Sequence, residues 1–191
     1  MPWTVVIPVR APGKTRLGRG PEFARAIALD TIEAAVASAA DVIVVTADAE
    51  IAAATTAHVV LEPEPAGIAA AIALGLADAP ERVSRAAMLG DLPALDPSEL
   101  DAALAAAAAF GAAFVPDAEG TGTTLVTARA GSPFLHRFGP ASAESHRRAG
   151  LHELDLPATA GLRRDVDLEE HLRGLGARLG PRTSALLAAL D

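Results

Sequence analysis

The chain has 191 residues, with 16 basic against 24 acidic side chains and a formal net charge of −8. This length suits a single α/β domain over residues 1–191, and the acidic balance argues against a nucleic-acid binder that relies on a broad basic surface. Cysteine is absent, which excludes disulfides, thiolate metal ligands and cysteine nucleophiles. No apolar run reaches the roughly 18–20 residues of a membrane helix, and the N-terminus lacks a basic signal-peptide region. We therefore expect no membrane association and a cytoplasmic protein.

The first half of the chain alternates between strand and helix patterns. Apolar runs rich in β-branched residues predict strands at 3–9, 41–46, 58–61 and 84–89. Apolar residues at helical spacing predict helices at 23–36, 48–56 and 67–79. The segment 10–20 is rich in Gly, Pro and basic residues, which indicates a loop.

The second half continues the same alternation. Asp96 is placed to cap a helix that Pro97 and Glu99 favour at its first turn. Further strands are predicted at 112–115, 123–128 and 162–166, and further helices at 140–149, 168–179 and 183–190. The whole pattern predicts an α/β fold with a mostly parallel, twisted sheet and helices on both faces. In such sheets, ligands bind beyond the carboxyl ends of the strands.

Cations cluster in the loop after the first strand. Arg10, Lys14, Arg16 and Arg19 would lie at the ligand edge of the sheet, where they suit a polyanion such as a nucleoside triphosphate. A solvated basic loop is the alternative. The segment 12–15 ends like a phosphate-binding P-loop, but it lacks the first glycine and the uninterrupted helix of that motif.

Three carboxylates also follow predicted strands. Asp91 comes directly after one strand, and Asp165 and Asp167 lie two residues apart at the end of another, so that their side chains share a face. Together they could hold Mg²⁺, which takes oxygen ligands. Each also has a purely structural alternative: Asp91 could close a turn, Asp167 could form a capping box with Glu170, and Asp165 could pair with one of the two arginines before it.

Two turns could bind anions. The segment 119–124 enters a strand with two glycines and three threonines, and 138–142 opens a helix whose first turn contains Ser142. A hairpin turn and an ordinary helix cap are the alternatives. His146 lies on the same predicted helix as Ser142, and a surface position would explain it equally well. No role is assigned to His58, His136, His152 or His171.

In this order, the segments resemble the 2-phospho-L-lactate/phosphoenolpyruvate guanylyltransferase family, which makes a precursor of the deazaflavin coenzyme F-420. The resembling segments are 7–10 with 14–17, 90–95, 120–125, 138–142 with His146, and 165–167. The resemblance implies a single-domain nucleotidyltransferase related to molybdenum-cofactor guanylyltransferases, with the nucleotide-diphospho-sugar-transferase architecture.

The resemblance also implies a site and a reaction. GTP would bind at the first-strand loop, and an acceptor phosphate oxygen would attack its α-phosphorus in line, with pyrophosphate leaving. No general base is needed, because a phosphate monoester with a second pKa of about 6 is largely ionised at neutral pH. The implied nucleotide-binding residues are Arg10, Lys14, Arg16 and Gly67; the Mg²⁺ ligands are Asp91, Asp165 and Asp167; the acceptor phosphate lies at Thr123, Thr124, Gly139 and Ser142; and Lys14 and Asp91 are catalytic.

Two positions depart from the family pattern. Ala69 stands where an asparagine is common, which removes an amide from the expected base or ribose contacts. Thr124 stands where some members carry asparagine, which favours phosphoenolpyruvate over 2-phospho-L-lactate as the acceptor. A sugar-phosphate or molybdenum-cofactor nucleotidyltransferase and a non-catalytic GTP-binding module remain alternatives. The oligomeric state stays open, because the C-terminal helix at 183–190 could pack on the chain's own sheet or on a second subunit.

Overall fold

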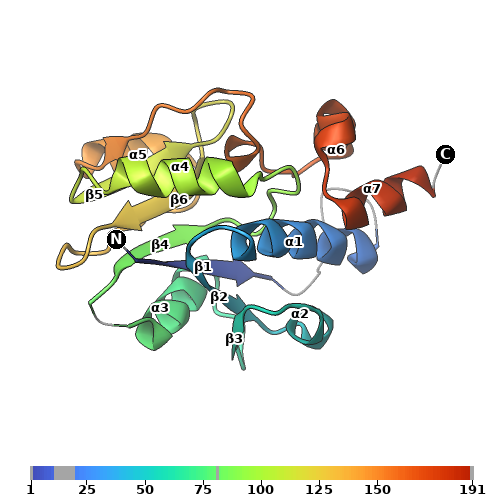
Figure 1. Ribbon diagram of the computed structural model, residues 1–191, viewed down its shortest axis with the longest axis horizontal. Helices are drawn as coiled ribbons and strands as arrows, with labels where there is room; N and C mark the ends of the chain where they lie inside the picture. Colours follow the sequence, from blue (N-terminus) through green and yellow to red (C-terminus); the bar gives the residue numbers. More distant parts are fainter. Residues whose placement is uncertain (1, 11–19, 81, 190–191) are drawn as a thin grey trace.

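A computed structural model describes residues 2–10, 20–80 and 82–189. The strands are β1 (Trp3–Val9), β2 (Asp41–Thr46), β3 (His58–Leu61), β4 (Ser84–Met88), β5 (Ala112–Pro116), β6 (Thr123–Ala128) and β7 (His152–Glu153). They form one sheet in the order β3-β2-β1-β4-β6-β5-β7 (Figure 1). β6 runs antiparallel to both of its neighbours, and the other pairings are parallel. The predicted α/β class with a mostly parallel sheet is confirmed.

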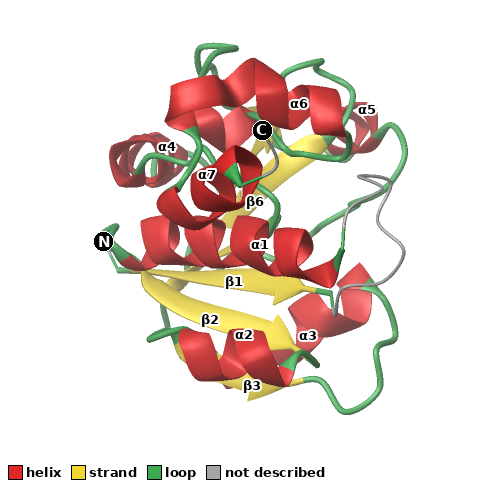
Figure 2. Cartoon of the chain, turned by 90° about the vertical axis from the view of Figure 1, so that its right-hand side faces the viewer, coloured by secondary structure: helices red, strands yellow, loops and turns green. Residues whose placement is uncertain are grey.

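Helices cover both faces of this sheet. They are α1 (Pro21–Val36), α2 (Ala49–Ala54), α3 (Ile68–Asp78), α4 (Pro97–Ala107), α5 (Ser142–Arg148), α6 (Glu169–Leu175) and α7 (Pro181–Ala188), with 3₁₀ turns η1 (Gly161–Arg163) and η2 (Gly176–Arg178). α1 and α3 lie on opposite sides of β1 and β2 (Figure 2). No helix of the described part of the chain combines the length and the apolar character needed to cross a membrane.

The alternation of side chains along β1 builds the two core layers. Val5 and Ile7 belong to the apolar cluster that includes Ile32 of α1 and Leu100 of α4. Val6 points the other way, into the cluster that α3 covers. Gly75 lets α3 approach closely, because a Cβ there would lie 2.5 Å from Val6 Cγ1 and 2.8 Å from Val45 Cγ2. The parallel strands are therefore buried on both faces, which fits their continuous apolar runs.

The C-terminal segment returns to α1 instead of extending the sheet. Asp30 of α1 is buried, and its carboxylate accepts the backbone N–H groups of Arg182 at 3.1 Å and Thr183 at 2.8 Å. These are free N–H groups of the first turn of α7, so Asp30 caps that helix from a distance. α7 consequently packs along α1 (Figure 2). The sequence left open packing on the chain's own sheet or on a second subunit, and within the chain α7 packs on helix α1.

The strand predicted at 162–166 is wrong. The N–H groups of Arg163 and Arg164 donate to the carbonyls three residues earlier, at Ala160 and Gly161, and this produces the turn η1 instead. Beyond it, the Val166 N–H group donates to the Asp91 carbonyl at 3.0 Å, which is a single link rather than a ladder. The last strand of the sheet is β7, a two-residue strand that the sequence pattern did not indicate.

The helix predicted at 168–179 is shorter than expected. α6 ends at Leu175, because Gly176 adopts φ +52°, a left-handed conformation that stops a helix. The turn η2 follows directly. The last helix begins at Pro181 and not at residue 183, with the proline at its first position.

Candidate active site

The nucleotide-binding residues predicted from the sequence fall in three different places. Arg10 directly follows β1 at its carboxyl end and is exposed. Gly67 precedes α3 as its N-cap residue, with φ +95°, a conformation that favours glycine. Lys14 and Arg16 lie outside the described residues, as does Arg19.

The three aspartates predicted as metal ligands lie on two neighbouring segments, but among the described residues their carboxylate oxygens do not form a group within 4.8 Å of one another. The hydrogen bond from the Val166 N–H group to the Asp91 carbonyl joins the loop after β4 to the segment 165–167. Burial raises the pKa of Asp91 to about 7, and the charges of Asp165 and Asp167 add to this rise. Burial likewise raises the pKa of Asp165 to about 6, assisted by the charges of Asp117 and then Asp167. The site therefore concentrates negative charge in a sheltered position at the ligand edge of the sheet.

The structural alternatives proposed for these aspartates are not what the structure shows. Oδ1 of Asp91 is covered from solvent, and no described residue offers it a hydrogen bond. α6 begins after Leu168, its N-cap, and no side chain caps it, so Asp167 does not form a capping box. Within the described ranges, neither Arg163 nor Arg164 makes an ion pair with Asp165.

Arg163 instead binds backbone carbonyls. Its guanidinium donates to the carbonyls of Pro116 at 3.1 Å, Asp117 at 2.7 Å and Leu156 at 2.7 Å. These bonds tie η1 to the end of β5. Arg163 thereby fixes the segment that carries Asp165 against the β5–β6 turn.

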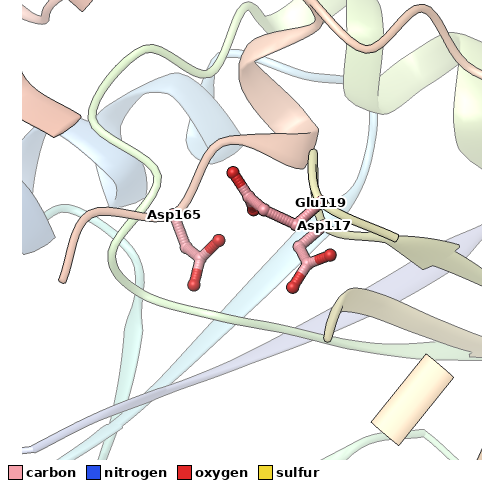
Figure 3. A group of neighbouring side chains, drawn as sticks. All are labelled: Asp117, Glu119 and Asp165. Atoms are coloured by element: carbon pink, nitrogen blue, oxygen red, sulfur yellow. The ribbon is translucent and has the colours of Figure 1, made fainter. Parts of the chain in front are cut away.

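A second acidic group shares Asp165 and was not predicted as a metal-ligand set. Carboxylate oxygens of Asp117, Glu119 and Asp165 lie within 4.8 Å of one another (Figure 3). The carboxylate of Asp117 also holds the turn, because it accepts the N–H groups of Thr121 at 2.8 Å and Gly122 at 2.6 Å. Sequence reasoning treated Glu119 only as the start of an anion-binding turn and missed Asp117. The available signal was an aspartate two residues after the predicted strand 112–115 and shortly before two glycines.

The predicted acceptor-phosphate residues lie on two contacting segments. The Ala143 N–H group of α5 donates to the Thr121 carbonyl at 3.1 Å, which docks the start of α5 on the β5–β6 turn. Thr123 and Ser142 are both buried beside this contact. The Leu89 N–H group donates to the Thr124 carbonyl at 2.9 Å, which brings the start of β6 next to the loop that carries Asp91.

The other two residues predicted to bind the acceptor phosphate, Thr124 and Gly139, differ in their local structure. The Thr124 hydroxyl donates to the Val115 carbonyl at 3.5 Å, on the opposite side of the strand from Thr123. Gly139 is exposed at φ +139°, and Ala141 adopts φ +53°, a conformation strained for a residue with a Cβ. These two positive angles turn the chain sharply just before Ser142.

His146 proves to be a core residue and not a surface residue. Its side chain is fully buried, and its ring contacts the rings of Phe114 and Phe138. Nδ1 lies 2.9 Å from Thr123 Oγ1, and Nε2 accepts the Arg137 N–H group at 2.8 Å. Burial lowers the pKa of His146 to about 4, so the ring is neutral at neutral pH.

Comparison with known proteins decides the family. The MobA-like NTP transferase domain matches residues 24–158. A phosphoenolpyruvate guanylyltransferase of Thermomonospora curvata is 45% identical over 98% of this chain and 90% of its own. One of Streptomyces scabiei is 43% identical over 100% of this chain and 98% of its own. The chain belongs to the phosphoenolpyruvate guanylyltransferase family. It is therefore a nucleotidyltransferase, as the resemblance of its motifs implied.

Solved structures support the fold of this guanylyltransferase family member. A nucleotide-diphospho-sugar transferase from Desulfovibrio desulfuricans G20 superposes with a TM-score of 0.72 at 22% identity, covering 100% of this chain and 96% of its own. Rv0371C of Mycobacterium tuberculosis H37Rv, solved in complex with manganese, superposes with a TM-score of 0.60 at 20% identity, covering 92% and 98%. At these identities the similarity establishes the architecture alone.

Proposed function

We propose that this chain transfers GMP from GTP to phosphoenolpyruvate, giving enolpyruvyl-diphospho-guanosine and pyrophosphate. The observation that carries the proposal is that the loop with Asp91 is joined to the segment with Asp165 and Asp167, so that their charges influence one another. Their carboxylates also lack the structural partners that the sequence allowed. The site lies next to the segments that hold Thr123 and Ser142. Relatives that match nearly the whole chain bear the name of this activity.

A divalent cation, Mg²⁺ in this proposal, suits the carboxylate site. The oxygens of Asp91, Asp165 and Asp167 are the hard ligands that Mg²⁺ prefers, and Asp91 Oδ1 has no protein partner among the described residues. Burial, and after it repulsion from Asp165 and Asp167, raises the pKa of Asp91, so a bound cation would relieve an unfavourable charge arrangement. When bound, the cation neutralises charge on the phosphates of the two substrates.

The chain's own residues would position the two substrates. Arg10, with Lys14 and Arg16, neutralises the triphosphate beyond β1, and Gly67 lets the backbone approach the nucleoside. Asp91 and Lys14 act directly at the reacting phosphates. The acceptor phosphate is held where Thr123, Gly139 and Ser142 lie, with Thr124 in the same strand. Holding both substrates in line supplies the main part of the rate enhancement.

The reaction balances without a protein nucleophile or general base. An ionised oxygen of the acceptor phosphate forms a bond to the α-phosphorus of GTP, while the bond from that phosphorus to the pyrophosphate oxygen breaks. A phosphate monoester with a second pKa of about 6 supplies this oxygen already deprotonated at neutral pH. The product would enter the synthesis of the deazaflavin coenzyme F-420.

The same site chemistry would accept 2-phospho-L-lactate, which differs from phosphoenolpyruvate only beyond the phosphate and carboxylate. The test incubates the purified protein with GTP, Mg²⁺ and either acid, with 3-phosphoglycerate as a third acceptor, and measures pyrophosphate release. We expect the highest kcat/KM with phosphoenolpyruvate. Higher kcat/KM with 2-phospho-L-lactate would change the assigned acceptor, and no release with any of the three acids would refute the guanylyltransferase proposal.

A further inference from the structure

We propose that His146 is a positioning residue that fixes the hydroxyl of Thr123 as a hydrogen-bond donor to the phosphate of the acceptor. The inference rests on the proposed function for the identity of that acceptor. His146 of α5 joins Thr123, the first residue of β6, to the backbone of Arg137 in the loop before α5.

The ring of His146 links three segments of the site. Nδ1 lies 2.9 Å from Thr123 Oγ1 at the start of β6, and Nε2 lies 2.8 Å from the backbone nitrogen of Arg137 in the loop after β6. Phe114 lies 5.3 Å and Phe138 6.0 Å from the ring, measured between centroids. These contacts hold the plane of the imidazole in one orientation.

The partners of the ring determine which nitrogen carries the proton. The Arg137 N–H group can only donate, so Nε2 must be the unprotonated nitrogen that accepts it. A neutral imidazole then carries its proton on Nδ1, which donates to Thr123 Oγ1. Full burial keeps the ring neutral and thus keeps this tautomer.

The hydroxyl hydrogen of Thr123 must then point away from His146. An oxygen that already accepts from Nδ1–H cannot direct its own hydrogen to the same atom. No described residue accepts a hydrogen bond from Thr123 Oγ1, although the residue is only 3% exposed. A buried donor without a partner is costly, so the site is completed by an acceptor from outside the chain.

The surroundings favour a phosphate as that acceptor. Thr123 follows a turn with two glycines, and the start of α5 with buried Ser142 docks on this turn through the Ala143 N–H group. A phosphate oxygen accepts hydrogen bonds and never donates them when ionised. Without His146 the Thr123 hydroxyl would be free to rotate, and fixing its hydrogen toward the phosphate would then reduce the affinity for the phosphate.

A double-mutant cycle tests the coupling. His146→Phe keeps an aromatic ring but removes both hydrogen bonds, and Thr123→Val keeps the shape but removes the hydroxyl. Each variant should raise KM for phosphoenolpyruvate about 10-fold with KM for GTP unchanged, which corresponds to about 1.4 kcal/mol. The double variant should be no worse than Thr123→Val. Independent effects that multiply to about 100-fold, or an equal rise in KM for GTP, would overturn the proposal.

His146→Asn provides the conservative rescue. Its amide N–H₂ group can occupy the place of Nδ1 and donate to Thr123, although it leaves the Arg137 N–H group without its acceptor. We expect His146→Asn to be less thermally stable than the wild type. Its KM for phosphoenolpyruvate should stay within about 3-fold of the wild-type value, compared with the 10-fold rise expected for His146→Phe. A purely structural role predicts that KM follows stability instead, and that result would contradict the proposal.

The wild-type protein gives a measurement that depends neither on variants nor on turnover. ¹⁵N NMR of the imidazole at pH 7 should find Nδ1 protonated and Nε2 unprotonated, and the opposite tautomer would overturn the inference while the proposed function stands. If phosphoenolpyruvate binds without reacting, the proposed function fails, and the same double-mutant cycle measured as Kd decides the role of His146. If phosphoenolpyruvate neither binds nor reacts, both proposals fail.

Discussion

At the scale of single residues, the neighbouring aspartates of the candidate site are expected to lower the stability of the metal-free protein while supporting its activity. Asp91 faces the charges of Asp165 and Asp167, and its covered Oδ1 has no partner in the part of the chain that the structure describes. Such groups raise the free energy of the folded protein and are retained for function. The proposed cation would convert their repulsion into attraction.

Asp91→Asn should therefore lose activity but not stability. We expect kcat/KM for GTP and phosphoenolpyruvate to fall by at least about 100-fold, because charge stabilisation worth several kcal/mol is lost. The free energy of unfolding without metal should be equal or higher, because one of the repelling charges is gone. Urea unfolding with steady-state kinetics measures both, and the exposed Asp155→Asn serves as the control. A variant that is less stable yet fully active would contradict the assignment.

The same aspartates predict a pH dependence of stability without metal. The pKa of Asp91 is raised to about 7 and that of Asp165 to about 6, so the folded state binds more protons than the unfolded state between pH 4 and 7. Their contribution to stability is thus present below pH 4 and is lost as the pH rises through 7. In EDTA, we expect the wild type to lose more unfolding free energy from pH 5.5 to pH 8 than Asp91→Asn does. Added Mg²⁺ should raise Tm more at pH 8, where protons no longer compete, and an equal effect at both values would contradict this prediction.

The sequence predicted those residues of the site whose position depends on strand order. Asp91 follows a strand that apolar content alone identifies, and the carboxyl ends of parallel strands converge at one edge. It did not predict the burial of His146, because a single histidine on a short helix has no periodic signal to distinguish core from surface. Asp117 was missed because its carboxylate works through backbone N–H groups of a turn that the sequence does not specify.

At the scale of elements, the 3₁₀ turn η1 lies directly before Asp165, and its backbone packs very closely against the backbone of another segment. A Cβ on Gly161 would lie 1.8 Å from the Ala94 carbonyl oxygen, and backbone cannot yield as a flexible side chain can. Gly161→Ala should push η1 away from the loop that carries Asp91. We expect a loss of about 1–3 kcal/mol in the free energy of unfolding and a fall in kcat.

Gly174→Ala is the matched control for that change. This glycine lies in α6, where an added Cβ would meet only Arg164 Nη2 at 3.9 Å, and alanine favours helix. Denaturant unfolding and kinetics of both variants check the prediction. If Gly161→Ala were as stable and active as Gly174→Ala, η1 would not be the element that positions Asp165.

The prediction of elements failed where tertiary contacts override the local pattern. Residues 162–166 have apolar and β-branched character at both ends, but Gly161 and the carbonyl contacts of Arg163 hold this region as a turn. β7 has only two residues and pairs with β5, so its signal is too short for any periodicity. The strands and helices with long apolar patterns were predicted within a few residues of their observed bounds.

At the scale of the whole molecule, the sequence predicted a sheet covered by helices on both faces, but not the order of its strands or the antiparallel direction of β6. Continuous apolar strands alternating with helices imply a parallel sheet covered on both faces, and this is what forms. The antiparallel insertion of β6 between β4 and β5 was not predicted, because strand direction depends on pairing across the molecule. It is this insertion that places Thr123 and Thr124 beside the end of β4.

The return of the C-terminal segment to α1 gives the last prediction. Asp30 accepts the N–H groups of Arg182 and Thr183, and α6 and α7 follow directly after the segment that carries Asp165 and Asp167. Asp30→Ala leaves these helix-terminal N–H groups without an acceptor, with an expected loss of about 1–2 kcal/mol in the free energy of unfolding. For a chain of this size that corresponds to a Tm lower by about 2–8 °C.

Glu33→Ala is the control that distinguishes the loss of the Asp30 cap from the loss of a surface charge. Glu33 also contacts Arg182, but as an exposed ion pair on the same side of α1, and such pairs contribute about 0–1 kcal/mol. Thermal unfolding of both variants with and without Mg²⁺ provides the measurement. Asp30→Ala should also weaken the Mg²⁺-dependent rise in Tm, because a loosened C-terminal segment holds Asp165 and Asp167 less firmly, whereas Glu33→Ala should leave that rise intact. Equal Tm values for the two variants would show that α7 does not depend on Asp30 for its attachment to α1.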